Sequence, residues 1–192
     1  MNKEPKDFIL ASGSPHRLAL LRTIGYEPKK IASANIDESE KKHEKPLAFV
    51  KRMALEKAKK AASLNPGENI LSADTIVVVN SKILHKSKTP EEQRKVMEAL
   101  SGKAHKVITS VCLCSKSGRI SQRTVTTRIL MKKMSEQEIR DYVACDEWVG
   151  VVGYSIEGRL GAYVKKIIGS YSGVVGLPLY ETKNLLNGEN IL

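Results

Sequence analysis

The pattern of apolar and polar positions along the chain predicts an α/β protein. Apolar or alternating runs are typical of strands, whereas apolar residues three or four positions apart are typical of helices that bury one face. Strands are therefore expected at residues 8–11, 27–34, 69–79, 82–84, 107–114, 120–131 and 160–168. Helices are expected at residues 15–24, 46–64, 90–100, 136–145 and 179–186. Strands and helices thus share the chain from end to end, without a low-complexity segment or an internal repeat.

The helices carry further signals at their ends and along their faces. Thr89 with Glu92, and Ser135 with Glu138, have the spacing of a capping box, in which side chains satisfy free amides at a helix start. The apolar stripe of the long second helix is expected to comprise Leu47, Val50, Ala54, Ala58 and Ala61. Lys57 lies at the edge of this stripe, so its side chain either extends outward to water or reaches inward to a bound anion.

The segment after the first strand reads as a tight turn followed by a helix start. Ser14 precedes Pro15, which makes Ser14 the expected N-cap and Pro15 the first helical residue. The free amides and the dipole at a helix start attract anions. Ser12 and Ser14 add hydroxyl donors, and His16 and Arg17 add basic groups. The turn is therefore either a phosphate-binding loop or an ordinary strand-to-helix turn with a good cap.

The strand expected at 69–79 is almost continuously apolar, which is typical of a central strand covered on both faces. Asp74 interrupts it. A carboxylate in such a strand is costly unless it is paired, hydrogen-bonded or bound to a metal. A carboxylate buried in a cleft can also act as a general base. Asp74 is therefore a candidate catalytic residue, and a structural aspartate that caps a neighbouring loop is the alternative.

The net charge of +11, from 32 basic and 21 acidic residues, favours anionic partners. It also raises the alternative of a nucleic-acid-binding protein. The basic residues are spread out, only 5% of residues are aromatic, and neither a ribonucleoprotein motif nor zinc-finger spacing is present. These features argue against a nucleic-acid partner.

Cysteine usage and hydropathy bear on the compartment. Cys112, Cys114 and Cys145 are odd in number and too sparse for a zinc site, so structural cysteines in a reducing compartment are expected. No apolar run is long enough to span a bilayer, and residues 1–7 contain no apolar signal region. The expectation is a soluble cytoplasmic protein without a membrane partner.

Several separate motifs resemble those of the Maf family of nucleotide pyrophosphatases. They are LASGSPHRLALLRTIG (10–25), MALEKAKKAA (53–62), SADTIV (72–77), LSGKAHKVITSVCL (100–113) and GSYSGVVGLPLYET (169–182). The motifs occur in order over nearly the whole chain, which makes the resemblance specific although no single motif would suffice. It implies a mixed twisted sheet flanked by helices, with two lobes around a cleft, in a Maf/ITPase-like fold. It also implies a single domain over residues 1–192.

The resemblance implies roles for individual residues. Asp74 falls on the family's general base, and Thr75 lies beside the substrate. Lys57 and Lys86 match the phosphate-binding lysines, although Lys86 alone would read as one more surface lysine. Glu38 matches an acidic residue that helps to hold a divalent metal, and oxygen ligands suit Mg²⁺ or Mn²⁺. Without the resemblance, Glu38 would read as part of a solvated loop.

The chain departs from the family pattern at positions that bear on the nucleobase. His16 stands where an arginine is common, Ser87 replaces a proline, and Glu157 replaces a glutamine. Family branches acting on dTTP and UTP have the glutamine, whereas a branch acting on 7-methyl-GTP has glutamate and lacks the arginine. The SADTIV segment nevertheless resembles the pyrimidine branch. Glu157 is therefore a candidate for selecting the base; the alternative is that it turns away or binds metal.

The reaction implied by the resemblance is hydrolysis of a nucleoside triphosphate to the monophosphate and pyrophosphate. Phosphate oxygens would be clamped by Arg17, Lys57 and Lys86, a divalent ion would be held by Glu38 with Asp74, and Asp74 would accept the proton of the attacking water. Members of the family often form homodimers, so a homodimer is a further expectation. The alternatives are a regulator of septum formation that binds nucleotide without catalysis, and a basic nucleic-acid-binding protein.

Overall fold

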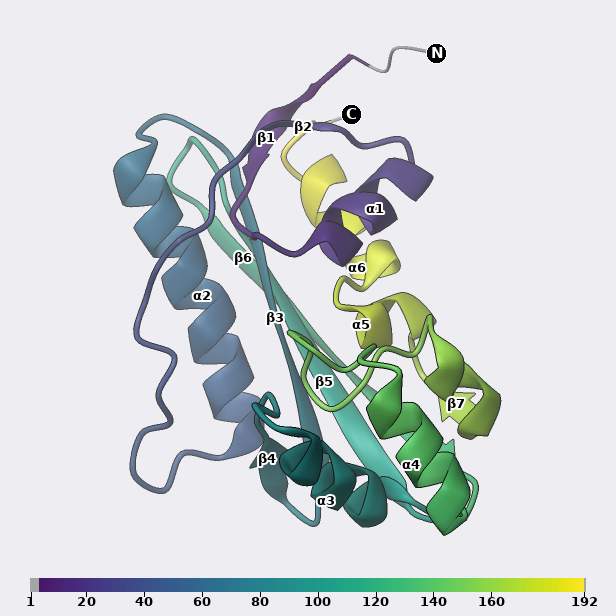
Figure 1. The fold of residues 1–192 in the computed structure, drawn as a ribbon. Coiled ribbons are helices and arrows are strands. Elements are labelled where there is room, and N and C mark those ends of the chain that lie inside the picture. Colours follow the sequence, from purple (N-terminus) through teal and green to yellow (C-terminus); the bar gives the residue numbers. More distant parts are fainter. Residues whose placement is uncertain (1–3, 192) are drawn as a thin grey trace.

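The computed structural model describes residues 4–191 (Figure 1). Residues 1–7 were expected to contain no apolar signal region, and the first three of them lie outside the described part. The strands are β1 (Lys6–Leu10), β2 (Pro28–Ile31), β3 (Ile70–Val79), β4 (Lys82–Leu84), β5 (Ala104–Cys114), β6 (Ile120–Met131) and β7 (Val164–Ile168). The helices are α1 (Pro15–Thr23), α2 (Pro46–Leu64), α3 (Pro90–Leu100), α4 (Glu136–Ala144), α5 (Tyr171–Val175) and α6 (Leu179–Asn187), with a 3₁₀ helix at Arg159–Tyr163. No helix in the described part of the chain is both long and apolar enough to cross a membrane.

The strands form one seven-stranded mixed sheet, as the sequence predicts. Their order is β2-β1-β3-β5-β6-β7, and β4 pairs with β3 beside this path. β1 runs parallel to both β2 and β3, whereas the remaining pairs are antiparallel. The parallel part follows from the α1 and α2 crossovers, because parallel neighbours need a connection that returns over the sheet.

The helices cover the two faces of the sheet in different ways (Figure 1). α2 lies along one face, where its buried side chains pack on β3 and β5. The opposite face carries two separate cores. α1 and α6 pack over residues such as Phe8, Leu10 and Leu71, which we call the first lobe. α3 and α4 pack over residues such as Val77 and Val107, which we call the second lobe.

β3 joins the two lobes. Leu71 belongs to the core of the first lobe and Val77 to that of the second, and Thr75 lies between them on the same face. Asp74 lies on the opposite face, toward α2. β1 pairs with β3 as far as Leu71, and β4 pairs from Val77 onward. Between these points, in the described chain, residues 72–76 have β5 on one side and no strand on the other. This open edge of β3 is where the cleft forms.

Some elements differ from the sequence-based expectation. The strand expected at 27–34 is only Pro28–Ile31, and the first part of 160–168 is a 3₁₀ helix. Pairing with β6 begins at Val164, so the residues before it have no strand partner and turn instead. Short α5 was not predicted, because its glycine-containing sequence has no helical period. The remaining strands and helices lie within a few residues of their expected bounds.

Two details of the helices were also predicted wrongly. Leu47 is 47% exposed, because it lies in the first turn of α2; Phe49 and Met53 pack on the sheet there instead. Thr89 does cap α3, but the Glu92 carboxylate accepts the amide of Lys88, so that capping box is incomplete. The box at the start of α4 is complete, as predicted.

His105 is a buried histidine whose ring should make stability depend on pH. Its Nε2 lies 2.5 Å from the Tyr154 hydroxyl, and its Nδ1 has no partner among the described residues. Burial lowers the pKa of His105 from 6.5 to about 4. The unfolded chain therefore binds this proton at higher pH than the folded protein does, so the free energy of unfolding should decrease as the pH falls from 6.5 toward about 4.

The measurement is urea unfolding of wild type and His105→Gln between pH 7.5 and 4. The difference between the two proteins isolates this residue from the other titrating groups. We expect the free energy of unfolding of wild type to fall more steeply with decreasing pH than that of the variant. Parallel pH profiles would show that the His105 ring accepts its proton without penalty in the folded state.

Candidate functional site

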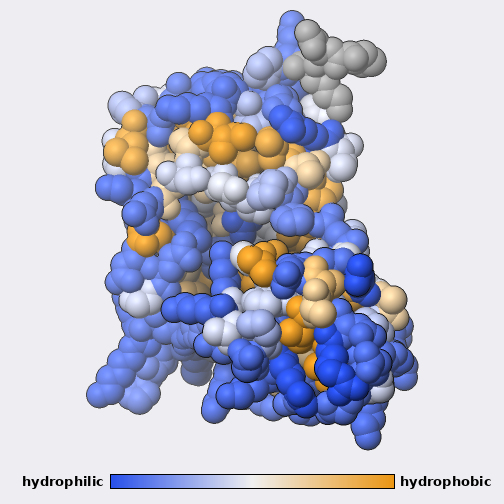
Figure 2. Space-filling view, viewed as in Figure 1, coloured by the Kyte–Doolittle hydropathy of each residue, from blue (hydrophilic) through white to orange (hydrophobic). Residues whose placement is uncertain are grey.

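A cavity of about 610 Å³ lies between the two lobes, at the open edge of β3. Figure 2 shows it as a hollow across the middle of the molecule. Its walls come from the β1–α1 turn, from α2 and β3, from the residues after β4, from the loop at 149–152 and from α5. The predicted site residues that line it are Ser12, Ser14, His16, Arg17, Glu38, Lys57, Asp74, Thr75 and Lys86.

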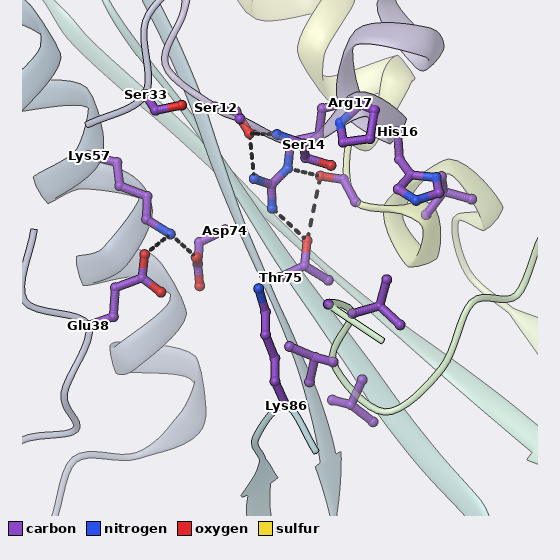
Figure 3. Close-up of a pocket in the computed structure, with 18 of the residues that line it drawn as sticks. Ser12, Ser14, His16, Arg17, Ser33, Glu38, Lys57, Asp74, Thr75 and Lys86 are labelled. Carbon is purple, nitrogen blue, oxygen red and sulfur yellow. Dashed lines mark hydrogen bonds and ion pairs between the residues drawn. The ribbon is translucent and has the colours of Figure 1, made fainter. Parts of the chain in front are cut away.

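Lys57 points inward and joins two carboxylates (Figure 3). Its Nζ lies 2.7 Å from Asp74 Oδ1 and 2.9 Å from Glu38 Oε1. Asp74 is 8% exposed, and the Lys57 side chain is 13% exposed. The ammonium group therefore compensates the buried carboxylate, which explains how an apolar central strand accommodates an aspartate. The Lys57 side chain therefore points inward rather than to water, and its contact with a phosphate stays a prediction.

Arg17 is partly buried and held by three partners. Its Nε donates to Gly176 O at 2.9 Å, one terminal nitrogen donates to Ser12 Oγ at 2.9 Å, and the other donates to Thr75 Oγ1 at 3.5 Å. Burial lowers the pKa of Arg17 from its ordinary value, and the negative charges of Asp74 and Glu38 act in the opposite direction. An arginine pKa is high enough that the guanidinium stays protonated. A fixed positive charge thus lies at the base of the cleft.

The turn before α1 has the free amides of an anion-binding loop. Ser14 is the N-cap by conformation, but its side chain makes no capping hydrogen bond; the Ser12 hydroxyl accepts the Ser14 amide instead. A Cβ on Gly13 would lie 2.9 Å from Ser33 Oγ, so a larger residue there would require the Ser33 side chain to shift. The first amides of α1 lie at the cleft without an intrahelical acceptor. Ser33 also lines the cavity, and no pattern in the sequence indicated it.

Lys86 and the His16–Glu157 pair lie toward the mouth of the cavity. Lys86 is exposed, and Figure 3 shows its side chain pointing toward Asp74 and Thr75. His16 Nδ1 lies 2.8 Å from Glu157 Oε2, and both side chains are exposed. His16 lines the cavity, whereas Glu157 contacts His16 and is not part of the lining. The structure therefore brings nine predicted residues together at the cavity, and Glu157 is joined to them only through His16.

The other half of the lining is apolar, and the sequence did not indicate it. The lining residues with apolar or aromatic side chains in this half are Val77, Val107, Val149, Val151, Val152, Tyr154, Val174 and Val175. They come from the sheet, from the glycine-containing loop and from α5, so no single period in the sequence marks them. A cleft with cationic groups at one end and aliphatic walls at the other suits a ligand that has both phosphates and a flat apolar ring.

Two carboxylates are available to a divalent ion. Glu38 and Asp74 converge on one cationic group, Lys57 Nζ, and both are oxygen donors of the kind that Mg²⁺ prefers. Mg²⁺ in phosphate-binding sites is commonly held by one or two carboxylates together with substrate phosphates. The described residues contain no group of three or more acidic, histidine or cysteine side chains arranged for a metal. The donor set thus fits an ion that binds together with a phosphorylated substrate.

The chain is similar to known proteins over most of its length. A model of the Maf-like protein family matches residues 7–189. A dTTP/UTP pyrophosphatase of Mesorhizobium japonicum is 44% identical over 188 residues, which cover 94% of this chain and 90% of the relative. A dTTP/UTP pyrophosphatase of Rhodopseudomonas palustris is also 44% identical over 188 residues, covering 94% of this chain and 91% of the relative.

Solved structures of other proteins superpose on part of the chain. A HAM1 protein from Coxiella burnetii has a TM-score of 0.48 at 18% identity and covers 66% of this chain and 73% of its own. A nucleoside-triphosphatase, dITP/XTP pyrophosphatase, from Mycobacterium abscessus has a TM-score of 0.42 at 13% identity and covers 65% of this chain and 72% of its own.

Proposed function

The chain belongs to the Maf family, and on this basis we propose that it is a nucleoside triphosphate pyrophosphatase acting on dTTP or UTP. The observation that carries the proposal is the convergence of Arg17, Lys57 and Lys86 with Asp74 in one cleft. Three cations suit the charge of a triphosphate, and the carboxylate suits a general base. The names of the relatives point to pyrimidine nucleotides.

The residues of the cleft have different roles in the proposed hydrolysis. Arg17, Lys57, Lys86 and the free amides of α1 bind phosphate oxygens and keep the triphosphate in one orientation. Asp74 Oδ1 is bonded to Lys57, whereas its Oδ2 has no hydrogen-bond donor among the described residues. Oδ2 is thus available to accept the proton of a water molecule that attacks the α-phosphorus. A bond forms from the water oxygen to this phosphorus, and the bond to the bridging oxygen breaks. Pyrophosphate leaves with the electron pair.

Glu38 and Asp74 are the residues that would hold a divalent ion. Such an ion would supply further positive charge next to the phosphates. Lys57 contacts both carboxylates in this structure and balances the charge of one of them, so a divalent ion would bind them either beside the ammonium group or after that group has moved away.

The direct test is release of pyrophosphate from a panel of nucleoside triphosphates with Mg²⁺ or Mn²⁺ supplied separately. We expect release from dTTP and UTP together with stoichiometric monophosphate. Release of orthophosphate alone would contradict cleavage at the α-phosphorus. Nucleotide binding without any release would favour the regulator of septum formation.

We further expect Glu157→Gln to shift base preference through His16. Guanine offers adjacent N–H donors that suit a carboxylate, whereas uracil and thymine offer one N–H between two carbonyls, which suits an amide. Glu157 lies outside the cavity lining but is 43% exposed beside His16, so a base at the His16 edge of the cavity would meet it. The variant should also change the contact that holds the His16 ring beside the cavity. We expect kcat/KM for UTP and dTTP to rise relative to GTP and 7-methyl-GTP on the order of tenfold, as for a contact worth about 1.4 kcal/mol.

The measurement is kcat/KM for the four nucleotides on wild type, Glu157→Gln and the control variant Glu147→Gln. Glu147 is a partly exposed glutamate that accepts the amide of Arg159 and does not line the cavity. An unchanged ranking of the four substrates in Glu157→Gln would remove Glu157 from the determinants of specificity.

A further inference from the structure

Thr109 is a buried hydroxyl beneath the cleft with two polar partners. It lies on β5 directly opposite Thr75 in the antiparallel register and is 1% exposed. Its Oγ1 lies 2.7 Å from Gly173 O and 3.0 Å from Thr75 Oγ1. Thr109 does not line the cavity. Thr109 is therefore separated from the cavity, but it contacts Thr75, which lines the cavity.

The direction of each hydrogen bond follows from the donors available. Gly173 O can only accept, and it accepts from the Thr109 hydroxyl at 2.7 Å. The same hydroxyl is directed at Thr75 Oγ1, which accepts from it at 3.0 Å. The Thr75 hydroxyl is in turn directed at Gly176 O at 3.5 Å, and its oxygen accepts from the Arg17 guanidinium at 3.5 Å. Thr109 thus ties Thr75, the neighbour of Arg17, to α5.

The same hydroxyl also anchors the second support of Arg17. Gly173 lies within α5, and Gly176 caps the end of α5 with a carbonyl that accepts Arg17 Nε at 2.9 Å. Thr75 Oγ1 donates to the same carbonyl at 3.5 Å. Thr109 contacts both α5 and Thr75, so loss of this one buried hydroxyl would disturb two of the three contacts that orient the guanidinium.

We propose that Thr109 is a positioning residue for the reaction, which holds Thr75 and α5 in place and thereby holds Arg17 in its phosphate-binding orientation. The proposal rests on the proposed function, since it assigns Arg17 to the triphosphate. Its physical basis is that charged groups accelerate a reaction only when they are held in the productive geometry, and small displacements are costly.

The chain offers a matched control in Thr127. It is also 1% exposed, lies on the neighbouring strand β6, and exchanges two hydrogen bonds with the Ser170 backbone at the start of α5. In the described part of the chain it makes no hydrogen bond to Thr75 or Arg17. Thr109→Val and Thr127→Val therefore each remove a buried hydroxyl that anchors α5, but only the first also removes the contact with Thr75.

The first experiment compares kcat and KM for dTTP and UTP in wild type, Thr109→Val, Thr109→Ser and Thr127→Val, with the melting temperature of each. We expect Thr109→Val to lower kcat/KM by about tenfold to a hundredfold. Thr109→Ser keeps the hydroxyl and should lie within about threefold of wild type, as should Thr127→Val at a comparable loss of stability. Equal losses of activity in the two valine variants would overturn the proposal, because they would reflect stability alone.

A double-mutant cycle with Thr75→Val tests the route. If Thr109 acts through Thr75, Thr109→Val should cost less than about threefold in the Thr75→Val background, whereas independent effects would multiply. Multiplicative effects would overturn the proposal.

Binding of inorganic pyrophosphate separates this proposal from the proposed function. Pyrophosphate should raise the melting temperature of wild type, and Thr109→Val should reduce that rise. If wild type binds pyrophosphate but hydrolyses no triphosphate, the proposed function fails, while a reduced rise in Thr109→Val still supports the positioning role. An equal rise in both proteins would contradict that role.

Discussion

Asp74→Asn is expected to reduce pyrophosphate release about 10²- to 10⁴-fold, which is the usual contribution of a general base. The amide keeps the size of the carboxylate and keeps an oxygen that can accept from Lys57, so the variant should remain folded. It cannot accept the proton of the attacking water. The measurement is kcat at saturating dTTP and UTP, with the melting temperature recorded alongside.

Asp37→Asn is the control for this experiment. Asp37 precedes Glu38 in the same loop, but its side chain accepts from the Ser39 amide and does not line the cavity. We expect near wild-type turnover from this variant. Turnover by a folded Asp74→Asn protein at the wild-type rate would leave Asp74 with a purely structural role as the partner of Lys57.

Removing the two cleft lysines is expected to have different consequences for stability and similar ones for activity. A hydrogen bond to a charged group is worth about 1.5–3 kcal/mol, so Lys57→Ala and Lys86→Ala should each lower kcat/KM by roughly tenfold to a hundredfold. Lys57→Ala also leaves the buried Asp74 without its partner and should lower the melting temperature. Lys86 is exposed and should affect activity alone.

The measurements are kcat/KM for dTTP and UTP and thermal unfolding, with Lys60→Ala as the control. Lys60 is an exposed lysine on α2, the helix that carries Lys57, and lies outside the cavity lining. It should resemble wild type in both measurements. Wild-type kcat/KM in both cleft variants would show that these lysines do not contact the substrate.

The sequence pattern predicts the sheet and Asp74, and the family resemblance supplies most of the rest of the polar half of the cleft. Asp74 interrupts an apolar strand, so it conflicts with its surroundings in a way that only a partner resolves. Lys57 lies at the edge of an apolar helix stripe, where the pattern alone left the direction of its side chain open. Serine or threonine at an N-cap, with or without a following proline, indicates a helix start, which is why the starts of α1, α3 and α4 were predicted well.

The remaining features depend on contacts between segments far apart in the chain. Thr109 is one of several buried polar residues in β5, and only the position of Gly173, 64 residues later, gives its hydroxyl a direction. The valines at 149–152 lie in a loop without a period, so their place in the cavity wall follows from tertiary packing alone. Glu157 was assigned to the cleft by resemblance, and its separation from the lining depends on where His16 points.

The first lobe is built from segments far apart in the chain, and this has a consequence for synthesis. β1 and α1 leave the ribosome long before α6, but the core they share with Leu177, Leu185 and Leu186 cannot close until α6 has emerged. The carbonyl that supports Arg17 belongs to Gly176, also near the end. A nascent chain can therefore carry every charged residue of the cleft and still lack a competent site. Loss of the final helices by proteolysis should likewise inactivate the protein without removing one of those charged groups.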